Sequence, residues 1–505
     1  MNKGSYVFST WLFLRFIGMI YACAFISLRV QIKGLVGKKG LWPAVEFLQL
    51  KIECRKAQKK SYTILRILHF LAGDDRFLQS LCNGGVLLSL LAIIGFIPPL
   101  VFFLLWIGYL SLLNICQIFL RYQWDILLLE TGFLAIFLTP LQVFSHGPSL
   151  YSSCVSCLMI RWLFYWLLFR LMFSSGIRKL QSGDSCWRNL TALNYHYETQ
   201  PLPTRLSWYA HQLPNWFHKI SVILMFMIEL IFPFLIFGPL SLRYLAAGSF
   251  IIFMLLIMAT GNYGFFNLLT IVLSLFLFDD SFYLPIFRFF VPSSSITNII
   301  LGASWPLWMV FPVMVVILLL SSIKICWMFG LKIPLPSFFE KLIARLEPLN
   351  LVNIYGLFTV MTTKRPEIIV EGSHDGSTWE TYEFKWKPGD LKQPPRWAAP
   401  HQPRLDWQMW FAALGNLHSN AWFLTFLQRL LEGTPEILAL LQKNPFINQP
   451  PRYIRAMVYD YHFTDHTTRR RMGLWWQRHP QWLYCPVFSL RGVEEKWMPP
   501  HQEIF

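Results

Sequence analysis

The chain has 505 residues, of which 55% are hydrophobic and only 14% are charged. A soluble globular domain carries about 25% charged residues, so this composition excludes an ordinary soluble protein and indicates a chain embedded in a lipid bilayer. The net charge of +17 does not indicate nucleic-acid binding, because the basic residues lie at the ends of apolar runs, as membrane anchors do.

Eight apolar segments approach the length of about 20 residues that a membrane-spanning helix needs. They are residues 9–30, 86–110, 126–145, 155–174, 220–239, 243–260, 263–278 and 305–328. The third and the seventh are short or carry charge, so we predict about seven to nine spans. No small-residue cleavage site is evident and basic residues follow the first apolar run, so this run is predicted to be a retained helix.

These patterns predict a mainly α fold with two parts. Residues 1–330 should form a polytopic transmembrane helical bundle, and residues 331–505 a soluble α+β domain with a β-sandwich-like part. In that domain residues 367–386 have the alternation of a β-hairpin around the turn sequence HDGS, and residues 452–463 alternate as a strand. Three helices are expected between them, at 405–418, 420–432 and 435–443.

A basic segment, residues 33–66, follows the first apolar segment with nine Lys or Arg against two Glu. Its central part is amphipathic, which suits a helix lying on a membrane face. The positive-inside rule places this segment in the cytoplasm. Three further spans then carry a polar loop at 176–219 to the opposite, non-cytoplasmic side, and four more leave the C-terminal domain on that side. The same count puts the N-terminus there as well.

The polar loop holds the main candidate site residues. If the loop is extended, His196 and Glu198 point the same way and could exchange a proton or bind a polar ligand, with His211 as a third catalytic candidate. A structural or docking role and a metal site are alternatives, although zinc needs tighter spacing than these histidines show. No metal or cofactor is expected. The candidates for docking the loop or a client are Asn194, Tyr195, His196, Tyr197, Glu198, Gln200, Pro201, Pro203 and Trp208.

Two further constellations lie near the predicted spans. Arg121 and Asp125 are one helical turn apart, with Glu130 further on, which predicts a polar clamp inside the membrane or, alternatively, a proton or ligand path. Cys154 and Cys157 have CxxC spacing at the start of a predicted helix, where a thiol pKa falls. A redox role is therefore an open hypothesis, although no thioredoxin-like pattern surrounds the pair.

Several segments together resemble the lipase maturation factor family. They are residues 13–44, 123–137, 187–214, 365–390 and 395–414, followed by LLEGTPEILALLQKNPF, PPRYIRAMVYDYHFTD and WWQRHPQWLYCP. The resemblance covers nearly the whole chain, in order and with plausible spacing, although no single segment is a catalytic motif.

The resemblance implies a multi-pass membrane protein that assists the folding of a secreted lipase client. Such a protein acts as a chaperone-like factor rather than as an enzyme, and lies in the endoplasmic reticulum of a eukaryote or the inner membrane of a bacterium. A distant similarity to the vitamin K-dependent γ-carboxylase superfamily implies the alternative, a membrane-embedded enzyme acting on a lipid-soluble or peptide substrate. A transporter fits less well, because no inverted repeat of spans is visible.

Overall fold

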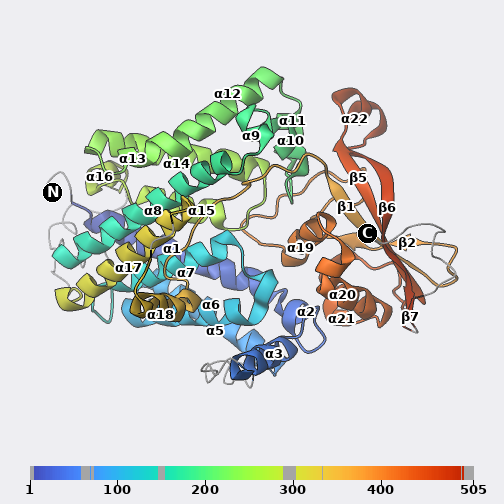
Figure 1. The fold of residues 1–505 in the computed structure, drawn as a ribbon, viewed down its shortest axis with the longest axis horizontal. Coiled ribbons are helices and arrows are strands. Elements are labelled where there is room, and N and C mark those ends of the chain that lie inside the picture. Colours follow the sequence, from blue (N-terminus) through green and yellow to red (C-terminus); the bar gives the residue numbers. More distant parts are fainter. Residues whose placement is uncertain are drawn as a thin grey trace.

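A computed structural model describes residues 5–57, 69, 73–145, 154–287, 303–331, 334–490 and 492–493. A bundle of long helices occupies one part of the molecule, and a domain with small antiparallel sheets lies beyond one end of the bundle (Figure 1). This arrangement confirms the predicted helical bundle followed by an α+β domain. Most of the second half of the predicted basic segment, residues 58–66, lies outside the described residues.

Seven helices of the described chain are long and apolar enough to cross a membrane. They are α1 (Val7–Arg29), α5 (Asp75–Ile94), α6 with a short 3-10 turn (Pro98–Phe119), α8 (Val155–Gln181), α12 to α13 (Asn215–Leu235), α14 (Leu240–Thr260) and α17 (Leu307–Met328). Two shorter apolar helices, α7 (Gln123–Leu138) and α15 (Phe266–Leu275), pack against α1, α8 and each other. Most of their side chains are buried, so these helices are covered by protein rather than by lipid.

The prediction of one span at 86–110 is wrong, because the chain turns back within it. α5 ends at Ile94, and Gly95 follows with a positive φ of 88° as a C-terminal cap, a conformation that favours glycine. α6 then begins at Pro98, whose missing N–H costs nothing in the first turn of a helix. The Gly-x-x-Pro-Pro sequence therefore converts one apolar run into a hairpin of two helices.

The additional helix changes which loops share an end of the bundle. The hairpin adds one reversal of the chain direction, so the start of α1 and the C-terminal domain lie at opposite ends of the bundle (Figure 1). The prediction that both lie on one side is wrong for this reason.

The basic segment lies at the same end of the bundle as the C-terminal domain, whereas the positive-inside count predicts the opposite end. It begins with α2 (Ile32–Val36) and α3 (Ala44–Ala57), and α2 packs against α21 (Pro435–Leu438) of the domain. The contact is close, since an added Cβ on Gly34 would clash with the carbonyl oxygen of Glu436.

The C-terminal domain contains two antiparallel sheets. The larger has the order β2-β1-β5-β6-β7, and the smaller pairs β3 with β4. The strands are β1 (Pro366–Ser373), β2 (Glu380–Thr381), β3 (Glu383–Phe384), β4 (Leu441–Lys443), β5 (Tyr453–Phe463), β6 (Trp476–Ser489) and β7 (Gly492–Val493). The predicted strand at 452–463 is confirmed. The predicted hairpin is confirmed only as far as Thr381, opposite Glu371, because the chain then leaves the larger sheet to join the smaller one.

The predicted helices of this domain are present as α19 (Arg404–Ala413), α20 (Ala421–Leu431) and α21. α20 buries one apolar face, including Trp422, Phe426 and Leu430, and exposes the other. The third helix is shorter than predicted, because residues 441–443 form β4 instead. α19 lies between the sheet and the helical bundle, and it therefore carries the residues that join the two parts (Figure 1).

Candidate functional site

The polar loop is helical rather than extended. It contains α9 (Ser185–Arg188), α10 (Ala192–Thr199) and α11 (Arg205–His211). Residues two apart in a helix point about 200° apart around its axis, so His196 and Glu198 have different neighbours. His196 Nε2 lies 3.3 Å from the Tyr263 hydroxyl, and its ring packs edge-on against Phe358. The predicted pairing of His196 with Glu198 is therefore wrong.

Arg365, which directly precedes β1, joins the polar loop to the C-terminal domain. Its guanidinium is 0% exposed and donates hydrogen bonds to three carbonyl oxygens at the C-terminal end of α10. These carbonyls belong to Glu198 (2.7 Å), Gln200 and Pro201 (2.9 Å). The last carbonyls of a helix have no partner within the helix, so one arginine here satisfies several of them.

Glu198 makes a second connection in the opposite direction, from the loop to β5. Its Oε2 accepts a hydrogen bond of 2.7 Å from the backbone N–H of Phe463, and its Oε1 lies 3.0 Å from His462 Nδ1. The Trp410 indole of α19 donates to the Thr199 carbonyl at 3.0 Å. We call these contacts of Arg365, Glu198 and Trp410 the loop–domain clasp.

The pKa values of two histidines beside Glu198 are shifted in opposite directions. The hydrogen bond to Glu198 raises the pKa of His462, whereas burial lowers the pKa of His211, whose Nε2 lies 3.6 Å from the same carboxylate. A raised histidine pKa stabilises the fold below the unfolded value of about 6.5, and this contribution is lost as the pH rises through the folded pKa. A lowered pKa instead removes stability as the pH falls below about 6.5.

We therefore expect His462→Asn to be more destabilising at about pH 6 than at about pH 8, and His211→Asn to show the reverse order. The measurement is the midpoint of thermal unfolding of the purified protein at both pH values, with His418→Asn in the same domain as the control. An identical pH dependence in the two variants would contradict the assignment of opposite pKa shifts.

The predicted clamp of Arg121, Asp125 and Glu130 is wrong in its pairing. Arg121 is exposed, whereas Asp125 is fully buried and bound by Arg404 of α19. The two guanidinium nitrogens lie 2.6 and 2.8 Å from the two carboxylate oxygens, and the Tyr109 hydroxyl donates to the same carboxylate at 2.6 Å. Asp125 thus fixes the C-terminal domain to the end of α7.

Glu130, the second acid of α7, also binds a distant part of the chain. It forms a buried ion pair with Arg170 of α8, and it accepts hydrogen bonds from the Tyr355 hydroxyl (2.7 Å) and the Asn353 backbone N–H (3.0 Å). Both acids therefore pair with residues outside α7, and together they hold the chain on either side of β1 against the bundle.

The CxxC pair is present as two thiols that are not joined by a disulfide, with Cys154 Sγ 2.9 Å from Cys157 Sγ. The pair lies where α8 begins, and the clasp lies beyond the end of this helix. α8 has 27 residues, so about 40 Å separate the pair from the clasp. The thiols are therefore at the opposite end of the bundle from the C-terminal domain.

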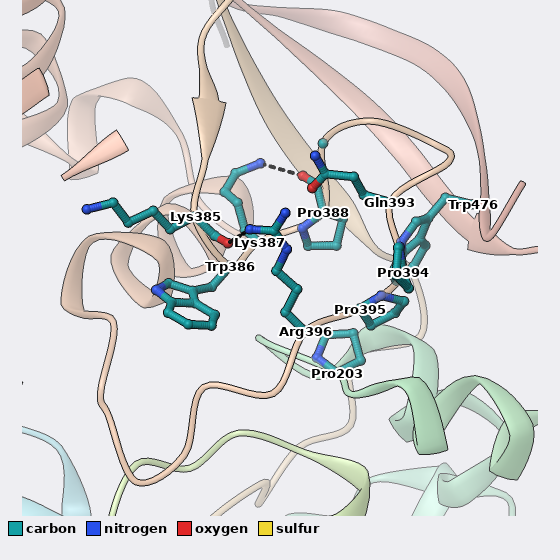
Figure 2. Close-up of a pocket in the computed structure, with 11 residues that line it drawn as sticks. Pro203, Lys385, Trp386, Lys387, Pro388, Gln393, Pro394, Pro395, Arg396 and Trp476 are labelled. Carbon is teal, nitrogen blue, oxygen red and sulfur yellow. Dashed lines mark hydrogen bonds between the residues drawn. The ribbon is translucent and has the colours of Figure 1, made fainter. Parts of the chain in front are cut away.

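A cleft adjoins the clasp between Pro203 of the loop and residues 385–396 of the domain (Figure 2). Its polar groups are already engaged, since Lys387 Nζ donates to the Pro388 carbonyl and Arg396 Nη1 to the Lys385 carbonyl. The volume open to the centre of a water molecule is only about 10 Å³. Ligand sites typically measure about 300–1,000 Å³, so this cleft is a closely packed joint rather than a substrate site.

Of the three predicted catalytic candidates, Glu198 and His211 lie side by side, but His196 does not join them. Burial lowers the pKa of His196 to about 4, so its ring is neutral at neutral pH, and it contacts Tyr263 rather than Glu198. Among the described residues, no group of three or more His, Cys, Asp and Glu side chains could hold a metal ion. Nothing in the described part of the chain favours the enzyme hypothesis over a docking role.

The docking candidates divide into a buried group and a more accessible group. Glu198, Gln200, Pro201, Pro203 and Trp208 are buried, and Trp208 packs at right angles to the ring of His466. Asn194, His196 and Tyr197 are half-buried, and Tyr195 is 38% exposed. The buried residues can hold the loop in place but cannot touch a client, so among these candidates Tyr195 is the best placed to do so.

Two parts of the chain match the models of known protein families. Residues 8–284 match the lipase maturation factor transmembrane domain, and residues 351–486 match the lipase maturation factor C-terminal domain. These boundaries coincide with most of the helical bundle and with the domain that carries both sheets.

Curated relatives extend the match over nearly the whole chain. Lipase maturation factor 2 of Xenopus tropicalis is 36% identical over 93% of this chain and 81% of its own length, and the Homo sapiens protein of that name is 35% identical over 95% and 82%. Lipase maturation factor 1 of Mus musculus is 34% identical over 98% of this chain and 89% of its own length. No solved structure matches the chain significantly. From both domain matches and these identities, the chain belongs to the lipase maturation factor family.

Proposed function

We propose that the protein is a membrane-bound maturation factor for secreted lipases, and that its C-terminal domain and polar loop form the part that meets the client. The names of the relatives support the client class. The observation that carries the proposal is the loop–domain clasp, which uses Arg365 and Glu198 to fix an exposed α+β domain to the polar loop. Rigid support of a recognition surface reduces the entropy lost on binding.

Exposed apolar side chains are available at this end of the molecule. They include Tyr195, Trp397, Phe411 and Trp482, whose exposed fractions range from 38% to 50%. Large aromatic side chains are enriched where proteins bind one another, because they bury much area at little entropic cost. A partly folded lipase exposes apolar surface that these residues could cover.

A secreted client folds outside the cytoplasm, so we assign the clasp end of the bundle to the lumenal side of the endoplasmic reticulum membrane. The vertebrate relatives support that compartment. The assignment opposes the positive-inside rule, since the basic segment lies at the clasp end. We give the client more weight, because a factor that acts on a secreted lipase must present its docking surface outside the cytoplasm.

Lipase activity in cells that lack the protein tests this function. We expect the specific activity of a secreted lipase, its activity per unit of lipase mass, to fall in such cells and to be restored by the whole chain. Co-purification of the lipase with the whole chain is the accompanying measurement. Normal specific activity in the deleted cells would contradict the proposal.

The CxxC pair should be dispensable for this function. Cys154 and Cys157 lie at the end of the bundle away from the clasp, so they cannot reach the disulfides of a client bound there. We expect the double variant Cys154→Ser/Cys157→Ser to restore lipase specific activity as fully as the unchanged protein, with membrane levels checked by immunoblot. A large loss at unchanged protein level would restore the redox hypothesis.

A further inference from the structure

A groove of about 480 Å³ lies at the end of the bundle away from the clasp. It opens between the first turns of α8 and α14, and Tyr6, which precedes α1, contributes to its wall. The lining residues are Tyr6, Leu158, Arg161, Trp162, Tyr165, Leu240 and Arg243. This set combines two cations with three aromatic and two leucine side chains.

The two guanidinium groups lie on aromatic rings and not on acids. Arg161 is 4.0 Å from the centre of the Tyr6 ring, and Arg243 is 5.4 Å from that of Tyr165. Arg243 Nη1 also donates to the Tyr6 hydroxyl at 2.5 Å, and its Nη2 donates to the Gly238 carbonyl at 3.4 Å. Within the described part of the chain neither guanidinium forms an ion pair, so two positive charges lie beside one groove without a neutralising acid.

The depth of the groove matches the level of lipid headgroups. Arg161 lies about 9 Å along α8 from Val155, and Arg243 about 4.5 Å along α14 from Leu240. The 27 residues of α8 measure about 40 Å, about 10 Å more than the hydrocarbon core of a bilayer. Trp162, 39% exposed, is placed like the tryptophans that line membrane interfaces.

We propose that this groove binds the headgroup phosphate of an anionic phospholipid. Arg161 and Arg243 would bind the phosphate oxygens, because a guanidinium donates two parallel hydrogen bonds to such a group. Leu158 and Trp162, both about 40% exposed, would contact the acyl chains. A free phosphate ion uses the same cations but gains nothing from these apolar side chains.

Lipid retention tests the site on the whole protein. The purified protein is exchanged into detergent with equal amounts of phosphatidylglycerol and phosphatidylcholine of the same chain length, washed, and analysed by mass spectrometry for bound lipid. We expect phosphatidylglycerol to be retained preferentially. Removal of each arginine should lower its retention about tenfold or more, because the charge-assisted hydrogen bonds from that guanidinium to the phosphate are lost.

The variants are Arg161→Gln, Arg161→Lys and the double variant Arg161→Gln/Arg243→Gln. Arg161→Lys keeps the charge and should retain more lipid than Arg161→Gln. The matched control is Arg188→Gln/Arg205→Gln, which removes two exposed arginines from the clasp end and should leave retention unchanged. Arg161→Gln alone keeps the test valid if the loss of Arg243 impairs folding, because the Arg161 guanidinium lies over the Tyr6 ring and forms no hydrogen bond or ion pair with the described residues.

Three results would overturn the proposal. One is unchanged phosphatidylglycerol retention in Arg161→Gln and in the double variant. Another is an equal loss in the control at Arg188 and Arg205. The third is an effect of inorganic phosphate alone: either it displaces the bound lipid, or it raises the thermal midpoint as much as phosphatidylglycerol does. Either effect would assign the site to a soluble anion.

Discussion

Replacing Asp125 with leucine should release the C-terminal domain from the helical bundle. The substitution leaves the Arg404 guanidinium buried at 0% exposure without its carboxylate, and it leaves the Tyr109 hydroxyl without an acceptor. Removing one partner of a buried ion pair costs about 3–5 kcal/mol, a large part of the stability of a typical domain. We expect an early unfolding transition and rapid proteolytic release of a fragment beginning near residue 351.

The double variant Asp125→Leu/Arg404→Met is the matched control for this prediction. It removes both charges, and replacing a buried ion pair with apolar side chains often changes the free energy of unfolding very little. Its thermal midpoint and protease resistance should therefore recover most of the loss found in Asp125→Leu. If the double variant loses as much as the two single variants together, Asp125 and Arg404 do not act as a pair.

Replacing Arg365 with methionine should open the loop–domain clasp while the bundle stays folded. The change removes every hydrogen bond from this guanidinium to the end of α10 and leaves Glu367 with Lys387 as its remaining ion-pair partner. A loss of about 3 kcal/mol corresponds to roughly 150-fold faster amide exchange if the loop opens locally. Hydrogen–deuterium exchange of residues 192–211 measures it.

The control for Arg365 is Arg455→Met on the neighbouring strand β5. Arg455 pairs with Glu371 at 2.7 Å but is 30% exposed, and exposed ion pairs contribute about 0–1 kcal/mol. Exchange in the loop should be unchanged in this variant. Equal exchange in the two variants would show that Arg365 does not hold the loop. Lipase specific activity should also fall in Arg365→Met and persist in Arg455→Met.

The sequence predicts the elements whose pattern is local. Apolar runs mark most of the spans, and the alternation of β5 and the amphipathic face of α20 are visible residue by residue. The hairpin of α5 and α6 escapes a count of apolar residues because its turn is itself apolar, and only Gly95 and Pro98 mark it. Because of this one turn, the basic segment lies at the same end of the bundle as the C-terminal domain and not at the opposite end.

The candidate site is harder to predict because its partners are far apart in sequence. Asp125 and Arg404 are 279 positions apart, and Arg365 and Gln200 are 165 apart, so no spacing rule connects them. Alternating polar residues from Asn194 to Gln200 imitate an extended segment. The helix forms instead because its sides contact different neighbours, among them Tyr263 and β5.

The central claim is that the polar loop, the basic segment and the C-terminal domain share one end of the bundle, and that this end faces the lumen. Its most direct test is labelling of one introduced cysteine at a time by a membrane-impermeant maleimide in intact microsomes, in a chain that lacks Cys23, Cys54, Cys154, Cys157 and Cys326, the native cysteines that are not buried. Exposed reporter positions are Tyr195, Lys39 and Ser377 at the clasp end and Ser241 at the other end.

We expect Ser241→Cys to be labelled in intact microsomes. Tyr195→Cys, Lys39→Cys and Ser377→Cys should be labelled only after detergent opens the membrane. Labelling of all three clasp-end positions from the cytoplasmic face would contradict the lumenal assignment, and labelling of Tyr195→Cys and Ser377→Cys from opposite faces would contradict the clasp itself.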